Sequence, residues 1–230
     1  MLLATAYAFR GLNVFKDGAQ SDQHALFSPS LSYAVPGTRL ALAYAGFYQW
    51  TGPNQRELVA AGVGHEQDLV VSFTAKSGAT SAVAALTYYA YPFAERSASG
   101  TRWPSYLEPS VTLTWSSAVD LGLQLLYFHG VQEAVAAGRY AYVHPSVTKS
   151  LALGAHTSLA VTVGAGYKDY VDQTIDDNVW DAHFDWKLTF ALGGGGYIAP
   201  AVHYTWTNLA REDSGGEYLV WAGVASGVSL

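Results

Sequence analysis

Apolar and polar residues alternate one by one along much of this chain, most clearly between Trp180 and Phe190. There, Trp180, Phe184 and Trp186 share one side with other apolar residues, and charged or polar residues fill every position between them. Successive side chains of a strand point to opposite faces, so this segment has one aromatic face and one ionic face. A soluble sheet would bury the aromatic face. A membrane barrel would turn it toward lipid and keep the ionic face in a wet lumen.

Similar runs, bounded by Gly, Pro, Asp and Asn, predict about twelve strands. Most are longer than the usual strand of about 5–6 residues, and they match the roughly 9–11 residues that cross a bilayer at a tilt. The expected strands are Leu2–Val14, His24–Val35, Arg39–Thr51, Gly64–Lys76, Ser81–Phe93, Pro109–Val119, Leu121–Gly130, Tyr140–Leu153, Ser158–Tyr170, Val179–Leu192, Tyr197–Leu209 and Tyr218–Leu230.

The connections between these strands alternate between long and short. Up-and-down membrane barrels have long loops outside and tight turns at the periplasmic side. The sequence therefore predicts an all-β fold: a transmembrane antiparallel up-and-down β-barrel of about 12 strands, in one domain over residues 1–230. The long connections are Lys16–Asp22, Thr51–Glu57, Ala94–Glu108, Val131–Gly138, Val171–Asn178 and Arg211–Glu217, and the short ones are Pro36–Thr38, Ser77–Thr80, Asp120, Gly154–Thr157 and Gly193–Gly196.

Three prolines and one lysine depart from this pattern. Pro29, Pro145 and Pro200 lie inside expected strands, where each removes a backbone donor, so we expect bulges there. Lys149 falls on the lipid face by strict count. Either its side chain reaches along the wall to the interface, or a bulge shifts the register.

The composition favours a membrane setting. Of 230 residues, 50% are hydrophobic and 13% charged, whereas charged residues make up about a quarter of ordinary soluble domains. A soluble protein this poor in charge would have trouble covering its surface. Aromatic rings also gather near the expected strand ends, the level at which amphipathic rings meet lipid headgroups. They are Tyr44, Tyr48, Trp50, Tyr127, Tyr167, Trp180, Tyr204, Trp206 and Tyr218.

Other features exclude several classes. The chain has no Cys, so disulfides and thiolate sites are ruled out. No apolar run reaches the roughly 18 residues of a transmembrane helix. A net charge of -6 without a basic cluster argues against nucleic acid as a partner. We interpret Met1 as an initiator before a mature chain whose secretion signal has been removed.

Three segments resemble the TorF-type porin family of Gram-negative bacteria: Tyr7–Leu12 followed by Gln20–Asp22, the aromatic Tyr88–Pro92, and Trp221–Val224. The resemblance implies an outer-membrane barrel with a pore role and no catalytic residues. Such barrels are inserted by dedicated machinery, and their last strand usually ends in Phe. This chain instead ends Val228-Ser229-Leu230, which implies either a trimmed end or altered recognition by that machinery.

The alternation assigns charges of both signs to the inner wall. Charged walls sort solutes by sign and size, although paired side chains can also fill a barrel of about twelve strands. An unpaired Arg in lipid costs about 2–4 kcal/mol at the midplane, so Arg10 is expected to face water or a carboxylate, with Asp68, Asp181 and Asp185 as candidates. The expected lumen-lining, selectivity-determining residues are Arg10, Arg39, Gln49, Asp68, Lys76, Gln124, His144, Lys168, Asp181, His183, Asp185, Lys187 and His203.

Two clusters point to alternative enzymatic functions. Asp181, His183 and Asp185 follow a long outer loop, so we expect them near the outer mouth, with His203 on the next strand. Such a cluster can activate water, as in omptin-like proteases, or bind a metal, but hydrogen bonding in a polar lumen is the favoured interpretation. A phospholipase site would need an outward Ser and His side by side. Ser117 and His129 are the candidates.

Two further motifs carry no chemistry in this interpretation. The acidic loop Asp172–Asn178 lacks the spacing and Gly of an EF-hand and is expected to be solvated. Gly193–Gly196 has no following Lys-Ser/Thr and is expected to be a tight turn.

The sequence therefore predicts a non-enzymatic channel in the outer membrane of a Gram-negative bacterium. Its expected partners are outer-membrane lipid, small hydrophilic solutes or ions that diffuse passively, and the insertion machinery, with no cofactor and no metal. The alternatives are a barrel enzyme of omptin-like or phospholipase type, and a soluble lipocalin-like barrel whose apolar face points inward.

Overall fold

The computed structural model describes residues 1–5, 8–9, 12–13, 24–51, 65–90, 105–131, 139–171, 179–208 and 218–229. In these ranges no helix is long and apolar enough to cross a bilayer. The strands are β1 (Leu2–Ala4), β2 (Ala8–Phe9), β3 (Leu12–Asn13), β4 (His24–Ser28), β5 (Ser30–Ala34), β6 (Leu40–Thr51), β7 (His65–Ser77), β8 (Thr80–Ala90), β9 (Tyr106–Ser116), β10 (Asp120–Gly130), β11 (Tyr140–Gly154), β12 (Thr157–Tyr170), β13 (Val179–Ala191), β14 (Gly196–Thr207) and β15 (Tyr218–Val228).

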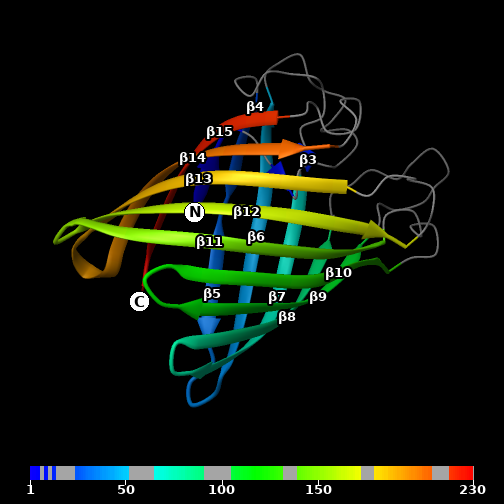
Figure 1. Cartoon of the computed structure of the whole chain (residues 1–230), viewed down its shortest axis with the longest axis horizontal. Helices are drawn as coiled ribbons and strands as arrows, with labels where there is room; N and C mark the ends of the chain where they lie inside the picture. The colour runs from blue at the N-terminus through cyan, green and yellow to red at the C-terminus, as the bar shows by residue number, and fades with distance from the viewer. Residues whose placement is uncertain are drawn as a thin grey trace.

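These strands form a closed antiparallel barrel of 12 strands, as the sequence predicted. Each of β6 to β15 pairs with its neighbours in sequence, and β1 closes the sheet by pairing with both β15 and β4. β4 and β5 act as one barrel strand, because both pair with β6 in a single register. Figure 1 shows β10 to β13 crossing in front of β5 to β7, with the two walls enclosing the lumen.

Short turns connect the strands at one end of the barrel, and the strand ends that border the longer connections are at the other end (Figure 1). Three of these turns contain glycines with positive φ, a conformation that favours glycine: Gly37 at 73°, Gly78 at 57°, and both Gly194 and Gly195. Gly193–Gly195 form a short 3-10 turn, which confirms the expected tight turn.

One expected strand, Leu2–Val14, is wrong as a single element. Only Leu2–Ala4 enters the barrel wall, whereas β2 and β3 pair with each other in a separate two-stranded sheet. Phe9 pairs with Leu12, so the chain reverses between them. The alternation there belongs to a hairpin and not to the wall.

The expected bulges at the three prolines are also wrong. Pro29 interrupts a strand between β4 and β5, and Pro145 and Pro200 remain inside β11 and β14. The residue pairs on either side of each proline keep the same register. A missing N–H therefore leaves a local gap in the ladder and does not shift it. The register shift of β11 lies elsewhere, between Ala152 and Gly154 near the turn.

Large apolar side chains face outward around the barrel. Trp180 and Trp186 are 50% and 41% exposed, whereas Asp181, the neighbour of Trp180, is 4% exposed on the opposite face. The same contrast recurs from strand to strand, and the exposed apolar residues include Leu31, Leu69, Val71, Leu113, Leu125, Val147, Val163, Val202 and Val220. An outward apolar band is what a lipid-facing barrel needs. It leaves the lipocalin-like alternative, which requires the apolar face inside, with less support.

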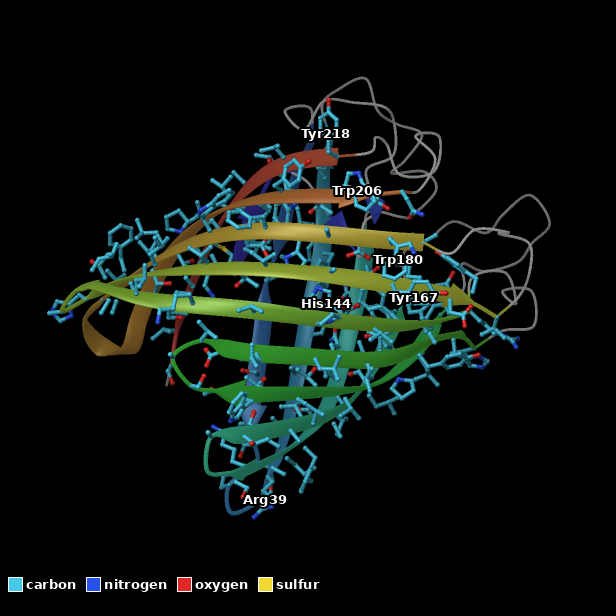
Figure 2. The ribbon with its side chains drawn as sticks, in the orientation of Figure 1. Arg39, His144, Tyr167, Trp180, Trp206 and Tyr218 are labelled. Carbon is cyan, nitrogen blue, oxygen red and sulfur yellow. The ribbon has the colours of Figure 1, made fainter. Side chains whose placement is uncertain are left out.

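Aromatic rings border this apolar band. Tyr167 and Trp180 pack together with centroids 4.6 Å apart, and Trp206 and Tyr218 lie at the same end of the barrel (Figure 2). Lys149 lies on the outer face near the other end, and its Nζ donates to the backbone oxygen of Ala118 at 2.5 Å. Of the two expectations for this lysine, reaching along the wall is therefore the correct one.

Candidate functional site

A chain of hydrogen bonds joins four side chains on the inner wall. Nδ1 of His183 and Nδ1 of His203 lie 2.5 Å and 2.7 Å from the two oxygens of Asp185. Nε2 of His183 lies 2.7 Å from Nε2 of His144. Asp185 and His203 are directly opposite each other on β13 and β14, and His183 is two residues from Asp185 on the same face. We call these four residues the His–Asp network.

The contact between His144 and His183 bridges two strands that do not touch. β12 lies between β11 and β13, and Gly164 is its inward residue at this level. A Cβ on Gly164 would lie 2.7 Å from Nε2 of His144 and would overlap Nε2 of His183. Only a residue without a side chain leaves room for the two imidazoles to meet over the strand.

The next inward position of β12 repeats this arrangement. The hydroxyl of Tyr142 donates to Asp181 at 3.0 Å, again from β11 to β13. Gly166 lies between them, and a Cβ there would overlap the Tyr142 hydroxyl. Tyr142 and Asp181 are both buried, so this bond satisfies a carboxylate that is shielded from water.

The network ends at an apolar part of the inner wall. The imidazole of His203 stacks on Trp221, with ring centroids 3.7 Å apart and planes at 11°. Trp221 packs against a small inner cluster formed by Leu2, Ala4, Leu26 and Phe47. The inner wall therefore has an apolar patch where the first and last strands meet, besides the cluster of Leu126, Tyr140 and Tyr142 on β10 and β11. The sequence interpretation anticipated neither.

Buried charges gather nearer the end that carries the long connections. Glu66, Asp68 and Glu108 are buried on the inward face of β7 and β9, and Tyr89 donates to Glu108 at 3.0 Å. Lys168 of β12 is also buried, with its Nζ 5.9 Å from the centre of the Tyr140 ring. Acidic and basic side chains therefore both occupy this level of the lumen.

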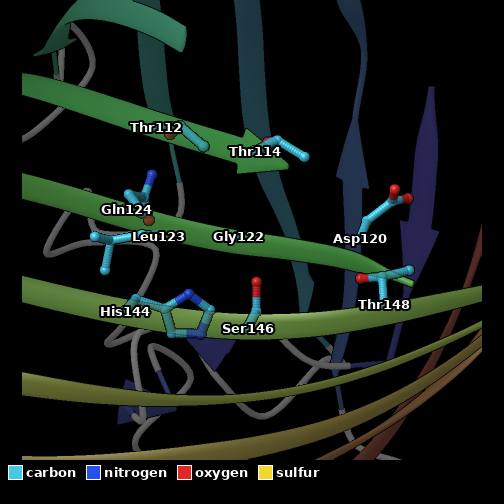
Figure 3. A pocket seen from close by; sticks show the side chains of 9 residues that line it. All are labelled: Thr112, Thr114, Asp120, Gly122, Leu123, Gln124, His144, Ser146 and Thr148. Atoms are coloured by element: carbon cyan, nitrogen blue, oxygen red, sulfur yellow. The ribbon is translucent and has the colours of Figure 1, made fainter. Parts of the chain in front are cut away.

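A recess of about 350 Å³ opens in the wall beside His144. Small side chains create it, since a Cβ on Gly122 would lie 2.5 Å from Oγ of Ser146. Most of its lining carries hydroxyl, amide or imidazole groups that can bind a polar solute. Figure 3 shows the lining residues, which are Thr112, Thr114, Asp120, Gly122, Leu123, Gln124, His144, Ser146 and Thr148.

The structure brings together four of the expected site residues, namely the His–Asp network. It places Asp68, Lys168 and Asp181 at the level of buried charge, and Gln124 in the recess. Lys76 and Lys187 are exposed and lie toward the turn end. Arg39 lies in the exposed turn before β6, away from the network (Figure 2). Arg10 and the side chain of Gln49 lie outside the described residues, so neither can be placed.

Two expectations about chemistry need correction. The network lies midway along β13 and not at the outer mouth, because Asp185 is central in Val179–Ala191. Ser117 and His129 do not form a pair: Ser117 lies in the turn before β10, where its hydroxyl donates to Val119, and His129 is near the far end of β10. Among the described residues, no group of three or more His, Asp or Glu is arranged to hold a metal. The acidic loop Asp172–Asn178 lies outside them.

The sequence interpretation missed several residues that shape this wall: Glu66, Glu108, Tyr142, Gly164, Gly166 and Trp221. The counting rule that selected Asp68 and His144 also places Glu66, Glu108 and Tyr142 on the inner face. The two glycines, at alternate positions of one strand, signalled space on that face. Trp221 belongs to the Trp221–Val224 motif, and alternation along this strand places its ring on the inner face.

Comparison with known proteins supports the fold. No protein-family model and no curated protein matches the chain. Among solved structures, the NanC porin superposes with a TM-score of 0.56 at 11% identity, covering 90% of this chain and 94% of NanC. An outer-membrane channel from Pseudomonas putida F1 gives a TM-score of 0.54 at 10% identity, covering 98% of this chain and 94% of the channel. At such low identity these likenesses show a shared outer-membrane barrel architecture.

Proposed function

We propose that the chain is an outer-membrane channel of a Gram-negative bacterium, through which small hydrophilic solutes or ions diffuse passively. The observation that carries the proposal is the inverted polarity of the wall, with apolar side chains outside and hydrogen-bonded polar groups inside. This arrangement suits a water-filled path through lipid. The two similar structures are a porin and a channel, and the motifs resemble TorF-type porins.

The residues proposed to govern passage are those expected from the sequence. The His–Asp network and the recess offer polar contacts in mid-wall, and Asp68, Lys168 and Asp181 place charges nearer the long connections. Arg10, Arg39, Lys76 and Lys187 are proposed to contribute charge along the path. Charged walls of this kind sort solutes by sign.

The geometry favours a channel over an enzyme. Both oxygens of Asp185 interact with imidazole nitrogens, and Nε2 of His183 meets His144. A general base needs a free lone pair within reach of a substrate proton. In this network, the carboxylate oxygens of Asp185 face the Nδ1 atoms of His183 and His203. Nε2 of His183 faces the imidazole of His144.

Planar-bilayer recording tests the proposal. The purified barrel is expected to give discrete conductance steps. Ser146→Trp, which fills the recess, should lower the step size, whereas Val147→Trp, on the outward face of the same strand, should leave it unchanged. A folded barrel that inserts and conducts no current would overturn the channel function. Hydrolysis of peptides or phospholipids that is lost in Asp185→Ala and His183→Ala would establish the enzyme alternative.

A further inference from the structure

The carboxylate of Asp185 fixes where protons lie in the His–Asp network. An ionised carboxylate only accepts hydrogen bonds, so Nδ1 of His183 and Nδ1 of His203 both carry a proton. A neutral His183 then presents an unprotonated Nε2. The proton in its 2.7 Å contact with His144 therefore belongs to Nε2 of His144. With all three rings neutral, the network carries a single negative charge.

The contact between His144 and His183 can accommodate only one added proton. The ring centroids are 4.8 Å apart and the planes differ by 17°, so the imidazoles meet nearly edge to edge. If one ring is charged, the other still offers a lone pair. If both are charged, both nitrogens are donors, no hydrogen bond exists between them, and two positive charges are in contact. The second proton must break the contact.

The surroundings allow both protonation steps. His144 borders the recess beside Gln124 and Ser146, so its ring has space to turn away (Figure 3). His203 lies on the face of Trp221, and an indole face attracts a cation. A charged His203 can therefore remain in its place.

Other titratable groups face the network from the elements around it. Tyr142 of β11 and Asp181 of β13 are hydrogen-bonded to each other. Lys168 of β12 is buried nearer the long connections, and Lys187 of β13 is exposed two residues beyond Asp185. Among the described inward residues of β14 and β15, the titratable ones are His203 and Tyr197, whose ring lies over Gly227 near the turn end. The buried carboxyl groups of Glu66, Asp68 and Glu108 also line the lumen, on β7 and β9. Histidine commonly changes charge between pH 5 and 8, so the part of a response in that range that belongs to the network is the part that histidine variants remove.

We infer that His144, His183, Asp185 and His203 act as one titrating unit that sets the charge preference of the lumen, and that acidification moves this preference toward anions. The unit goes from one negative charge to one positive charge as His203 and one ring of the His144–His183 pair gain protons. A further proton opens the pair. The inference rests on the proposed channel function and names the property of the solute, its charge, that the channel selects.

Reversal potentials in a KCl gradient test the selectivity. In the wild-type protein the chloride-to-potassium permeability ratio should rise several-fold between pH 8 and pH 5. The combined variant His144→Gln, His183→Gln, His203→Gln should lose most of this rise. His129→Gln and His156→Gln are matched controls that should keep it, since His129 packs on Tyr127 and His156 lies in a turn. An unchanged ratio in wild type, or a full rise in the combined variant, would overturn the inference.

A second test uses NMR spectroscopy on the wild-type protein and requires neither a conductance measurement nor a variant. With ¹⁵N-labelled histidine, the folded barrel should show a scalar coupling between Nε2 of His144 and Nε2 of His183 at pH 8. The coupling should vanish at acidic pH, when the contact opens. A conducting barrel without the coupling would overturn the titrating unit alone. A barrel that shows the coupling and stays silent would overturn the channel function.

Discussion

The Tyr142 hydroxyl and the Asp181 carboxylate meet across an intervening strand, 3.0 Å apart. The strands that carry these two residues do not pair with each other, because β12 lies between β11 and β13. The bond depends on Gly166, which keeps the inner surface of β12 flat at that point. At Gly164 and Gly166, side chains from two strands that do not pair can therefore bind each other over the strand between them.

Gly166→Ala is expected to destabilise the barrel by about 1–3 kcal/mol, because the new Cβ overlaps Tyr142 and forces it away from Asp181. Gly154→Ala is the matched control, since a Cβ there meets nothing within 4 Å. Urea titration of the barrel folded in lipid vesicles measures both free energies of unfolding. Equal stability of the two variants would refute the steric account.

Tyr142→Phe removes the donor and keeps the ring. Asp181 is buried and loses a hydrogen bond to its carboxylate, which should cost about 1–3 kcal/mol. Tyr218→Phe removes a hydroxyl from an exposed ring and should be nearly neutral. A double-mutant cycle with Asp181→Asn isolates the pair, and a coupling energy near zero would show that the bond contributes nothing to stability.

Adjacent residues of β7 test which side of the wall meets lipid. Val71 faces outward and Ser72 faces the lumen. Val71→Lys should destabilise the folded barrel by about 2–4 kcal/mol, as a cation near the bilayer midplane does, whereas Ser72→Lys should have little effect. Folding equilibria in vesicles report both changes. The reverse order would place the apolar face away from lipid.

Single cysteines test the orientation, because the chain has no natural Cys. Val131→Cys, at the end with long connections, should react in intact cells with a bulky maleimide that cannot cross the outer membrane. Ala79→Cys, in the turn between β7 and β8, should react only after the cells are permeabilised. Labelling of Ala79→Cys alone in intact cells would invert the proposed orientation.

Strand number and wall polarity could be predicted from the sequence because both depend on local alternation. The segment around Trp180 and Asp185 shows this. Whether a side chain points outward or inward follows from its even or odd position along the strand, whatever its neighbours are. Alternation does not predict the structure where parity is not the deciding property. Leu2–Val14 alternates as a strand should, yet a reversal between Phe9 and Leu12 takes its second half out of the wall.

The contacts of the site could not be predicted in the same way, because they depend on register. Ser117 and His129 are expected on adjacent strands at matching parity, yet Ser117 lies in the turn before β10 and His129 lies near the far end of that strand. Conversely, His144 and His183 are on strands that do not pair, and they touch only because Gly164 lies between them. Such contacts depend on the register between strands and on single glycines. The alternation of apolar and polar residues predicts neither.

The seam that closes the wall has a consequence for how the protein forms. Residues 1–5 join β1 to β15, with Leu2 opposite Ala225 and with backbone hydrogen bonds at Met1 and Thr5. The strands that close the barrel are therefore separated by almost the entire length of the chain. Contacts between residues this distant in sequence require a loss of chain entropy before any stabilising interaction forms. We therefore expect the pairing of β1 with β15, which closes the barrel, to be the last and slowest stage of assembly. The remaining strands should pair before it, one hairpin after another.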